Sequence, residues 1–205
     1  MKVKTYIFAV VFLVLLLVLL LAAKSLAESS SSREYQIKAA FLYNFLMFVD
    51  WPPEKMGDNS QPIIIGIIGN APFENAFEPL KNKQVNNRNV IVKRFKGLEE
   101  LKKSSEAERN QAIEDIKKCH LLYICRSEQA VLKEIIDLVK DRNILTVASM
   151  DKFLESNGMI NFVLDEDKVR FEINLTAAKQ AKLQIRSQLL RLAKRVIGEE
   201  QEAKN

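Results

Sequence analysis

Histidine is almost absent from this sequence, and its scarcity excludes several kinds of catalytic and metal site. His120 is the only histidine among the 205 residues. The chain therefore has neither a repeated His–Asp catalytic pair nor a metal site built from several histidines. Its neighbour Cys119 would allow a two-ligand metal clip, but the sequence offers no second pair to complete it. We expect His120 to be a structural residue with a hydrogen bond at the start of a strand.

Glycine is also scarce, and the glycines that occur do not form a nucleotide-binding motif. Gly66-Ile-Ile-Gly69 lies at the end of an apolar run, yet it lacks the third glycine of a dinucleotide fingerprint and the lysine of a P-loop. No Gly-x-Ser-x-Gly elbow is present. We expect these two glycines to allow close packing against a covering helix, and we predict no catalytic residue, no metal and no cofactor.

The two cysteines, Cys119 and Cys125, are six positions apart. If the apolar residues between them form a strand, their Cα atoms lie roughly 20 Å apart, at about 3.3 Å per residue. A disulfide requires less than about 7 Å. We therefore predict free, buried thiols, and a bond to a second chain is the alternative.

Residues 1–27 have the composition of an export signal. Two lysines precede an unbroken apolar run over residues 6–23, and small residues at Ser25 and Ala27 fit cleavage after Ala27. The run is also barely long enough to span a bilayer, so an uncleaved N-terminal anchor is the alternative. Both interpretations place the rest of the protein outside the cytoplasm.

The charge of the remaining chain is small. Removing residues 1–27 removes Lys2, Lys4 and Lys24 and no acidic residue, so the net charge of +5 becomes +2. A nucleic-acid-binding protein needs a concentrated basic face, and we therefore predict no nucleic-acid partner. The roughly 178 remaining residues are enough for one sizeable core.

The segment over residues 35–50 has apolar residues at helical spacing on two stripes, one of which contains Ile37, Phe41, Phe45 and Phe48. It predicts a central packing helix that is covered on two sides. The sequence Trp51-Pro-Pro should end this helix, because residues before proline are pushed out of the helical region.

Strand-like and helix-like segments alternate after this helix. We expect strands over residues 62–69, 90–95, 121–125, 143–148, 159–164 and 169–175, and a loop over 85–89. We expect helices over 72–80, 97–118 (one helix or a pair), 128–140 (capped by Ser127), 177–183 and 187–197. This order predicts a single α/β domain with a mainly parallel sheet flanked by helices and a late antiparallel hairpin. The expected boundaries are a Ser-rich tether over residues 28–33, the domain over 34–197 and a charged tail over 198–205.

The last expected strand carries a row of polar residues on one face. The odd-numbered residues from Val169 to Leu175 are apolar, so Arg170, Glu172 and Asn174 share the opposite face. This row is either a solvated face or part of a recognition surface shaped with the loop near residues 157–161. The candidate partner-binding residues are Phe153, Met159, Asn161, Arg170, Glu172 and Asn174. Residues of this set that are exposed would be functional, whereas buried ones would be structural.

Several motifs, in this order, resemble those of the YfiR family of bacterial periplasmic proteins. The resemblance runs from about Glu34 to Val196. It is carried by Tyr35-Gln-Ile-Lys-Ala-Ala-Phe-Leu-Tyr-Asn-Phe45, Phe48-Val-Asp-Trp-Pro52, Cys119-His-Leu-Leu-Tyr-Ile124, Leu145-Thr-Val147, Gly158-Met-Ile-Asn-Phe162, Arg170-Phe-Glu-Ile-Asn-Leu175-x-Ala-Ala and Ser187-x-Leu-Leu-Arg-Leu-Ala193.

The resemblance implies a non-enzymatic periplasmic regulator. Such a protein would bind the periplasmic sensor domain of an inner-membrane diguanylate cyclase, repress it and lower cyclic-di-GMP, which controls biofilm. An OmpA-like outer-membrane lipoprotein would sequester it, and it would form a homodimer.

One alternative is a periplasmic small-ligand-binding or accessory protein that uses the crevice at the strand ends. Another is a hydrolase with an unrecognised site.

Overall fold

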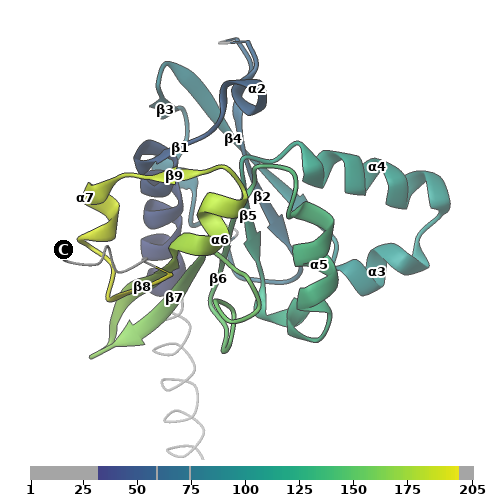
Figure 1. Cartoon of the computed structure of the whole chain (residues 1–205). Coiled ribbons are helices and arrows are strands. Elements are labelled where there is room, and N and C mark those ends of the chain that lie inside the picture. Colours follow the sequence, from purple (N-terminus) through teal and green to yellow (C-terminus); the bar gives the residue numbers. More distant parts are fainter. Residues whose placement is uncertain (1–31, 59, 74, 199–205) are drawn as a thin grey trace, which may run out of the picture.

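The computed structural model describes residues 32–58, 60–73 and 75–198 (Figure 1). Residues 32–48 are helical. The strands are β1 (Val49–Asp50), β2 (Ile63–Ile68), β3 (Gln84–Val85), β4 (Arg88–Phe95), β5 (Leu121–Ile124), β6 (Leu145–Ala148), β7 (Ile160–Asp165), β8 (Lys168–Asn174), β9 (Gln184–Ile185) and β10 (Arg195–Ile197). The other helices are α2 (Pro53–Met56), α3 (Leu98–Lys103), α4 (Glu106–Lys117), α5 (Leu132–Val139), α6 (Leu175–Gln180) and α7 (Ser187–Leu190), and the 3-10 helices are η1 (Glu78–Leu80) and η2 (Arg126–Val131).

Eight strands form one sheet in the order β10-β8-β7-β6-β5-β2-β4-β3. The neighbours from β4 through β2, β5 and β6 to β7 are parallel, and β10 is parallel to β8. The β7–β8 and β3–β4 pairs are antiparallel. The predicted fold class, an α/β domain with a mainly parallel sheet and a late antiparallel hairpin, is confirmed.

Helices cover both faces of the sheet. Alternate residues of β5 belong to different hydrophobic clusters: Leu121 and Tyr123 pack with residues 32–48, α6 and α7, whereas Leu122 and Ile124 pack with α3, α4 and α5. Figure 1 shows α3, α4 and α5 together on one side of the sheet. This double coverage explains why the central strands read as continuous apolar runs in the sequence.

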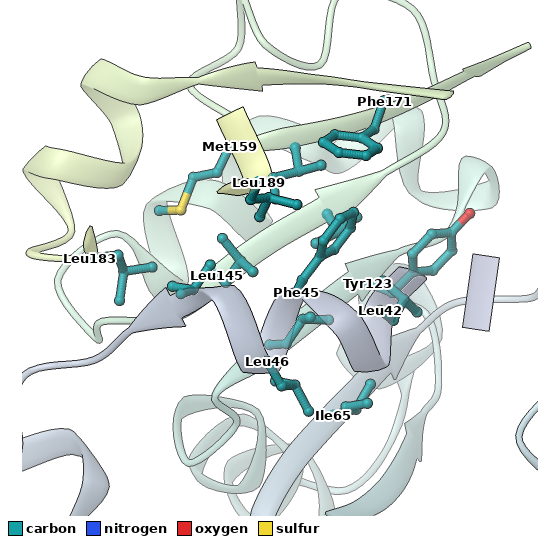
Figure 2. Packing of buried hydrophobic residues seen from close by; sticks show 14 of the residues in the cluster. Leu42, Phe45, Leu46, Ile65, Tyr123, Leu145, Met159, Phe171, Leu183 and Leu189 are labelled. Atoms are coloured by element: carbon teal, nitrogen blue, oxygen red, sulfur yellow. The ribbon is translucent and has the colours of Figure 1, made fainter. Parts of the chain in front are cut away.

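The helical residues 32–48 lie against one face of the sheet, with Leu42, Phe45 and Leu46 fully or almost fully buried (Figure 2). The ring of Phe45 lies 5.7 Å from that of Phe162 on β7 and 5.2 Å from that of Phe171 on β8, measured between centroids. Coverage on two sides was expected. Residues of both predicted stripes are buried, Phe45 on one and Leu46 on the other, but Ile37 remains 38% exposed.

The chain leaves the helix earlier than residue 50. Val49 and Asp50 form β1, which pairs with β9 in a separate two-stranded sheet. Arg186 strengthens this junction, because its guanidinium donates to both carboxylate oxygens of Asp50 at 3.0 and 2.6 Å. The side chain of Trp51 is buried, and its Nε1 donates to the carbonyl oxygen of His120 at 3.2 Å.

The ends of the sheet differ from the sequence-based expectation. The expected loop over residues 85–89 is part of the β3–β4 hairpin, because Asn86 and Asn87 both adopt positive φ (51° and 63°) and form a two-residue turn. The expected helix over residues 187–197 stops after α7. Its last three residues form β10, and their pairing with β8 satisfies backbone groups at the edge of that strand.

Three further expectations are corrected. Of the described residues in the helix expected over 72–80, only η1 is helical, and residues 75–77 form a turn. Ser127 does not cap α5, since η2 precedes that helix and Ser127 lies within η2. A Cβ on Gly66 would lie 2.7 Å from Cys119 Sγ and 2.9 Å from Leu122, so this glycine permits close approach of neighbouring side chains and not of a covering helix.

The predicted leader over residues 1–27 lies outside the described residues, as does the charged tail except for Gly198. Within the expected tether, the two residues that are described, 32 and 33, are already helical. No helix in the described part of the chain is long and apolar enough to cross a membrane.

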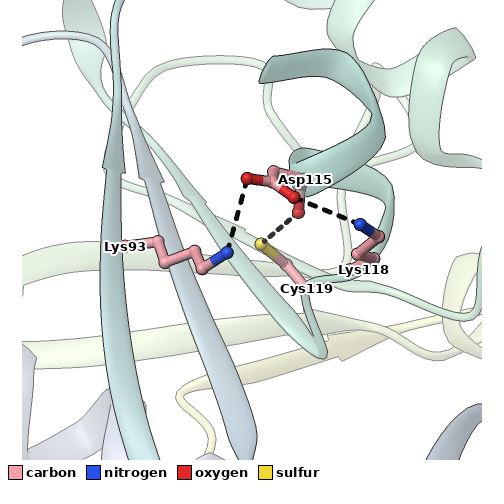
Figure 3. A network of polar contacts seen from close by, with 4 residues as sticks. All are labelled: Lys93, Asp115, Lys118 and Cys119. Carbon is pink, nitrogen blue, oxygen red and sulfur yellow. Dashed lines mark hydrogen bonds and ion pairs between the residues drawn. The ribbon is translucent and has the colours of Figure 1, made fainter. Parts of the chain in front are cut away.

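Both cysteines are free and buried, as predicted. Burial raises the pKa of both thiols to about 12, so neither is a reactive thiolate near neutral pH. The thiol of Cys119 donates a weak hydrogen bond to the carbonyl oxygen of Asp115 at 3.5 Å, which holds it at the end of α4 (Figure 3).

We predict that Phe45→Ala lowers the free energy of unfolding by about 3–5 kcal/mol, because it removes a fully buried ring from the contact between helix and sheet. The matched control is Ile37→Ala, which removes an apolar side chain from the exposed side of the same helix and should cost under about 1 kcal/mol. Urea denaturation followed by circular dichroism measures both. Equal losses in the two variants would contradict this description of the packing.

Candidate functional site

Four of the candidate partner-binding residues are buried: Phe153, Met159, Asn161 and Asn174. Asn161 Oδ1 accepts a hydrogen bond from the backbone N–H of Met150 at 3.1 Å. Asn174 caps α6, since its Oδ1 accepts from the N–H of Ala177 at 3.0 Å, and its Nδ2 donates to the carbonyl oxygen of Leu154 at 2.9 Å. By the exposure criterion set out above, these four residues are structural.

Glu172 and Arg170 remain nearer the surface. The odd-numbered residues of β8 are on the core side as predicted, with Phe171 and Ile173 buried. Glu172 makes a bidentate ion pair with Arg195 on β10, with nitrogen–oxygen distances of 3.0 and 2.8 Å. Glu172 is therefore engaged within the sheet, and Arg170 is the candidate that is exposed.

The tip of the β7–β8 hairpin carries an exposed apolar residue that the sequence analysis missed. Leu164 on β7 is 61% exposed and lies opposite Val169 in the strand register. Arg170 lies opposite Val163, so Leu164 and Arg170 point to different faces of the hairpin. We call Leu164 and Arg170 together the hairpin surface.

The segment before β10 is fixed on this hairpin. The backbone N–H of Lys194 donates to the carbonyl oxygen of Phe171 at 2.8 Å, and its Nζ lies 2.6 Å from Asp165 Oδ1. Leu192, two residues earlier, is 60% exposed. An isolated exposed leucine in a turn has no periodic pattern, so only the fold identifies it as a surface residue.

Lys38 is a second residue that the sequence did not single out. It is 3% exposed, and its Nζ lies 3.1 Å from Ser149 Oγ and forms an ion pair with Glu34. The same nitrogen lies 4.9 Å from the centre of the Tyr35 ring. A buried ammonium needs such partners to offset its loss of hydration, and these contacts account for Lys38 as a structural residue.

A crevice lies at the carboxyl ends of β2, β4 and β5. After β2 the chain continues to β4 on one side of β2 and then crosses to β5 on its other side. This reversal makes the carboxyl end of β2 the topological switch point of the sheet. Open α/β sheets tend to bind ligands at such a point. The crevice has a volume of about 700 Å³ and is lined by Gly69, Asn70, Arg94, Phe95, Lys96, Gly97, Glu99, Glu100, Lys103, Ser127, Glu128, Ala130 and Val131.

The carboxylate of Glu128 occupies the inner part of this crevice. Glu128 Oε2 accepts from the N–H of Leu98 at 2.8 Å, and its Oε1 accepts from the hydroxyl of Ser127 at 3.0 Å. A Cβ on Gly69 or Gly97 would lie 2.6 or 2.5 Å from Glu128 Oε1, so both glycines make room for this carboxylate. The protein thus places its own negative charge where an anionic ligand would otherwise meet backbone N–H groups.

His120 lies at the opposite ends of the same strands and behaves as predicted, with a structural hydrogen bond immediately before β5. Its Nδ1 accepts from the N–H of Ile64 at 3.1 Å, so the proton of the neutral ring is on Nε2. Nε2 is buried without a hydrogen-bond partner among the described residues. Burial, with smaller contributions from the charges of Lys55 and Arg88, lowers the pKa of His120 to about 4.

Within the described ranges, no group of three or more His, Cys, Asp or Glu side chains is arranged to hold a metal ion. The polar clusters at both ends of the sheet are instead internally satisfied, apart from the Nε2 of His120.

We predict that Glu128→Ala lowers the free energy of unfolding by about 1–3 kcal/mol, because the N–H of Leu98 loses its acceptor. The matched control is Glu134→Ala, which removes a carboxylate that is 56% exposed and pairs with Lys102, and should cost under about 1 kcal/mol. Chemical denaturation measures the difference. Equal effects of the two substitutions would show that the Glu128 contacts contribute nothing to stability.

We also predict that acidification destabilises the fold through His120. Its pKa is about 4 in the folded protein and 6.5 when unperturbed, so between these values the unfolded chain binds more protons. The free energy of unfolding should therefore fall as the pH drops from 6.5 towards 4, by up to about 1.4 kcal/mol per pH unit from this group.

The control for this pH effect is His120→Asn, which places an amide oxygen near the position of Nδ1 and does not titrate. Denaturation curves at a series of pH values should give a smaller slope for this variant than for the unsubstituted protein. Because His120 is the only histidine, identical slopes would contradict the assignment.

A family model described as YfiR/HmsC-like matches residues 35–194. No protein with a curated description matches the chain. Among solved structures, a conserved domain protein from Vibrio cholerae is 12% identical, with a TM-score of 0.45 over 65% of this chain and 54% of that one. An ABC domain in complex with L-Trp from Streptococcus pneumonia is also 12% identical, with a TM-score of 0.44 over 66% of this chain and 55% of that one. The chain thus spans about half the length of these two proteins.

Proposed function

Because the chain belongs to the YfiR/HmsC-like family, known as periplasmic regulators of diguanylate cyclase, we propose that it represses such a cyclase. In this proposal the protein binds the periplasmic sensor domain of an inner-membrane diguanylate cyclase and lowers the synthesis of cyclic-di-GMP. The observation that carries the proposal is the family match, which spans residues 35–194 and so includes nearly all of the described domain. The apolar leader-like run over residues 6–23 supports export.

The proposed mode of action is contact and not catalysis. The buried candidates Phe153, Met159, Asn161 and Asn174 hold the hairpin and α6 in place. The hairpin surface offers a partner an apolar side chain, Leu164, on one face and a cationic side chain, Arg170, on the other. Arginine and exposed apolar residues are typical of contact surfaces between proteins. A homodimer and sequestration by an OmpA-like outer-membrane lipoprotein belong to the same proposal, and both follow from the family alone.

The alternative is a small-ligand-binding or accessory protein, and it has one specific observation in its favour, the crevice of about 700 Å³ at the switch point. The carboxylate of Glu128 disfavours an anionic ligand in the inner part of that site. A thermal-shift screen separates the two functions, because a ligand that binds the folded state raises the melting temperature.

We predict that deleting the gene in the native host raises cyclic-di-GMP and that the unsubstituted gene restores the lower level. Arg170→Glu should fail to restore it, since the charge of an exposed residue on the hairpin surface is reversed. The matched control is Lys133→Glu, an exposed position on α5 and so on a different element from the hairpin, which should restore repression fully.

Cyclic-di-GMP is measured by mass spectrometry of cell extracts, and circular dichroism verifies that each variant is folded. Unchanged levels in both the deletion strain and an overexpressing strain would argue against repression. Full complementation by Arg170→Glu would still be consistent with repression of the cyclase, but it would show that repression does not need the charge of the hairpin surface.

A further inference from the structure

The outer edge of β4 is largely uncovered. On one side β4 pairs with β2 over residues 90–95, whereas on the other side β3 reaches only Arg88 and Asn89. No described strand pairs with the outer side of residues 90–94. An open strand edge of this kind is a template on which another chain can pair.

The backbone direction along this edge follows from two independent contacts. Val85 and Arg88 are the pair that closes the two-residue turn, so the backbone groups of Arg88 point outwards, towards β3. The carbonyl oxygen of Phe95 accepts from the N–H of Gly69 at 3.2 Å, so the backbone of Phe95 points inwards, towards β2. Alternation along the strand then directs the N–H and C=O groups of Val90, Val92 and Arg94 outwards.

A groove of about 900 Å³ runs beside this edge, on the face that residues 32–48 cover. Its apolar lining includes Phe77, Leu80, Val90 and Val92. The hydroxyl of Tyr43 donates to the carbonyl oxygen of Gln84 at 2.7 Å, which fixes β3 at one end of the groove. Apolar side chains of an added strand would therefore find apolar surface on this face.

The charge beside the edge is positive. Lys83 and Arg94 line the groove, and neither has a carboxylate within ion-pair distance among the described residues. Lys81 is paired with Glu78 at 3.5 Å. On the opposite face of β4, Lys93 is paired with Asp115 at 3.4 Å (Figure 3), so the excess positive charge belongs to the groove side.

We propose that the edge of β4 over residues 90–94 binds an extended, acidic segment of another protein, which adds to the sheet as a further strand. Backbone hydrogen bonds to Val92 and Arg94 would supply affinity, and the charges of Lys83 and Arg94 would select acidic side chains. A second copy of this chain is disfavoured as occupant, because two such edges would bring like charges together. This surface is separate from the hairpin surface and goes beyond the proposed repression.

The probe is a fluorescein-labelled peptide in which valine and glutamate alternate. The expected result is saturable binding by fluorescence anisotropy, with the amide protons of Val92 and Arg94 protected from hydrogen exchange. A peptide with lysine in place of glutamate should not bind, because its charge is repelled. An acidic peptide N-methylated on the residues facing β4 should not bind either, since it cannot donate to the strand.

The variant Lys83→Glu/Arg94→Glu should weaken binding of the acidic peptide by about tenfold or more. The matched control is Lys133→Glu/Lys140→Glu, which changes the net charge equally on α5 and after it and should bind as the unsubstituted protein does. Absence of binding, equal binding of the lysine or N-methylated peptide, or equal effects of the two double variants would overturn the proposal. If the same amides become protected in the absence of peptide as the protein concentration is raised, the edge binds a second copy of this chain instead.

Discussion

The burial of the central strands on both faces is the constraint on which the rest of the structure depends. β2 and β5 have no polar face to offer water, so each needs a helical layer on both sides. Residues 32–48 supply one layer through Phe45, and α3, α4 and α5 supply the other. The crossover connections, the switch-point crevice and the exposed ends of the sheet all follow from that arrangement.

The sequence was informative where long apolar runs determine structure. The strands β2, β5, β6 and β7 and the helix containing Phe45 could be identified because their side chains are buried by the nearest layers. It was uninformative at the sheet margins, where β3 and β10 are only two and three residues long. Their conformation depends on pairing with distant strands, and the local spacing of Leu189, Leu190 and Val196 looked helical.

The candidate site shows the same division. Asn161 and Asn174 were grouped with Arg170 because polar residues in an apolar strand suggest recognition, yet both amides serve backbone groups of adjacent segments. Glu172 was placed correctly on the polar face of β8, but its partner Arg195 was unforeseeable while that residue was expected in a helix. Leu164 continues the two-residue period of the buried Ile160 and Phe162, so only the folded chain reveals its exposure.

The scarcity of glycine has a counterpart in the turns. Asn82, Asn86, Asn87, Asn143 and Asn157 all adopt the left-handed backbone conformation that glycine usually supplies. An asparagine restricts the unfolded chain more than a glycine does, so less conformational entropy is lost when these turns form. Asn143 also contributes a contact of its own, with Nδ2 donating to the carbonyl oxygen of Ala181 at 2.9 Å. The connections between strands are therefore ordered at a smaller cost in conformational entropy than glycine turns would require.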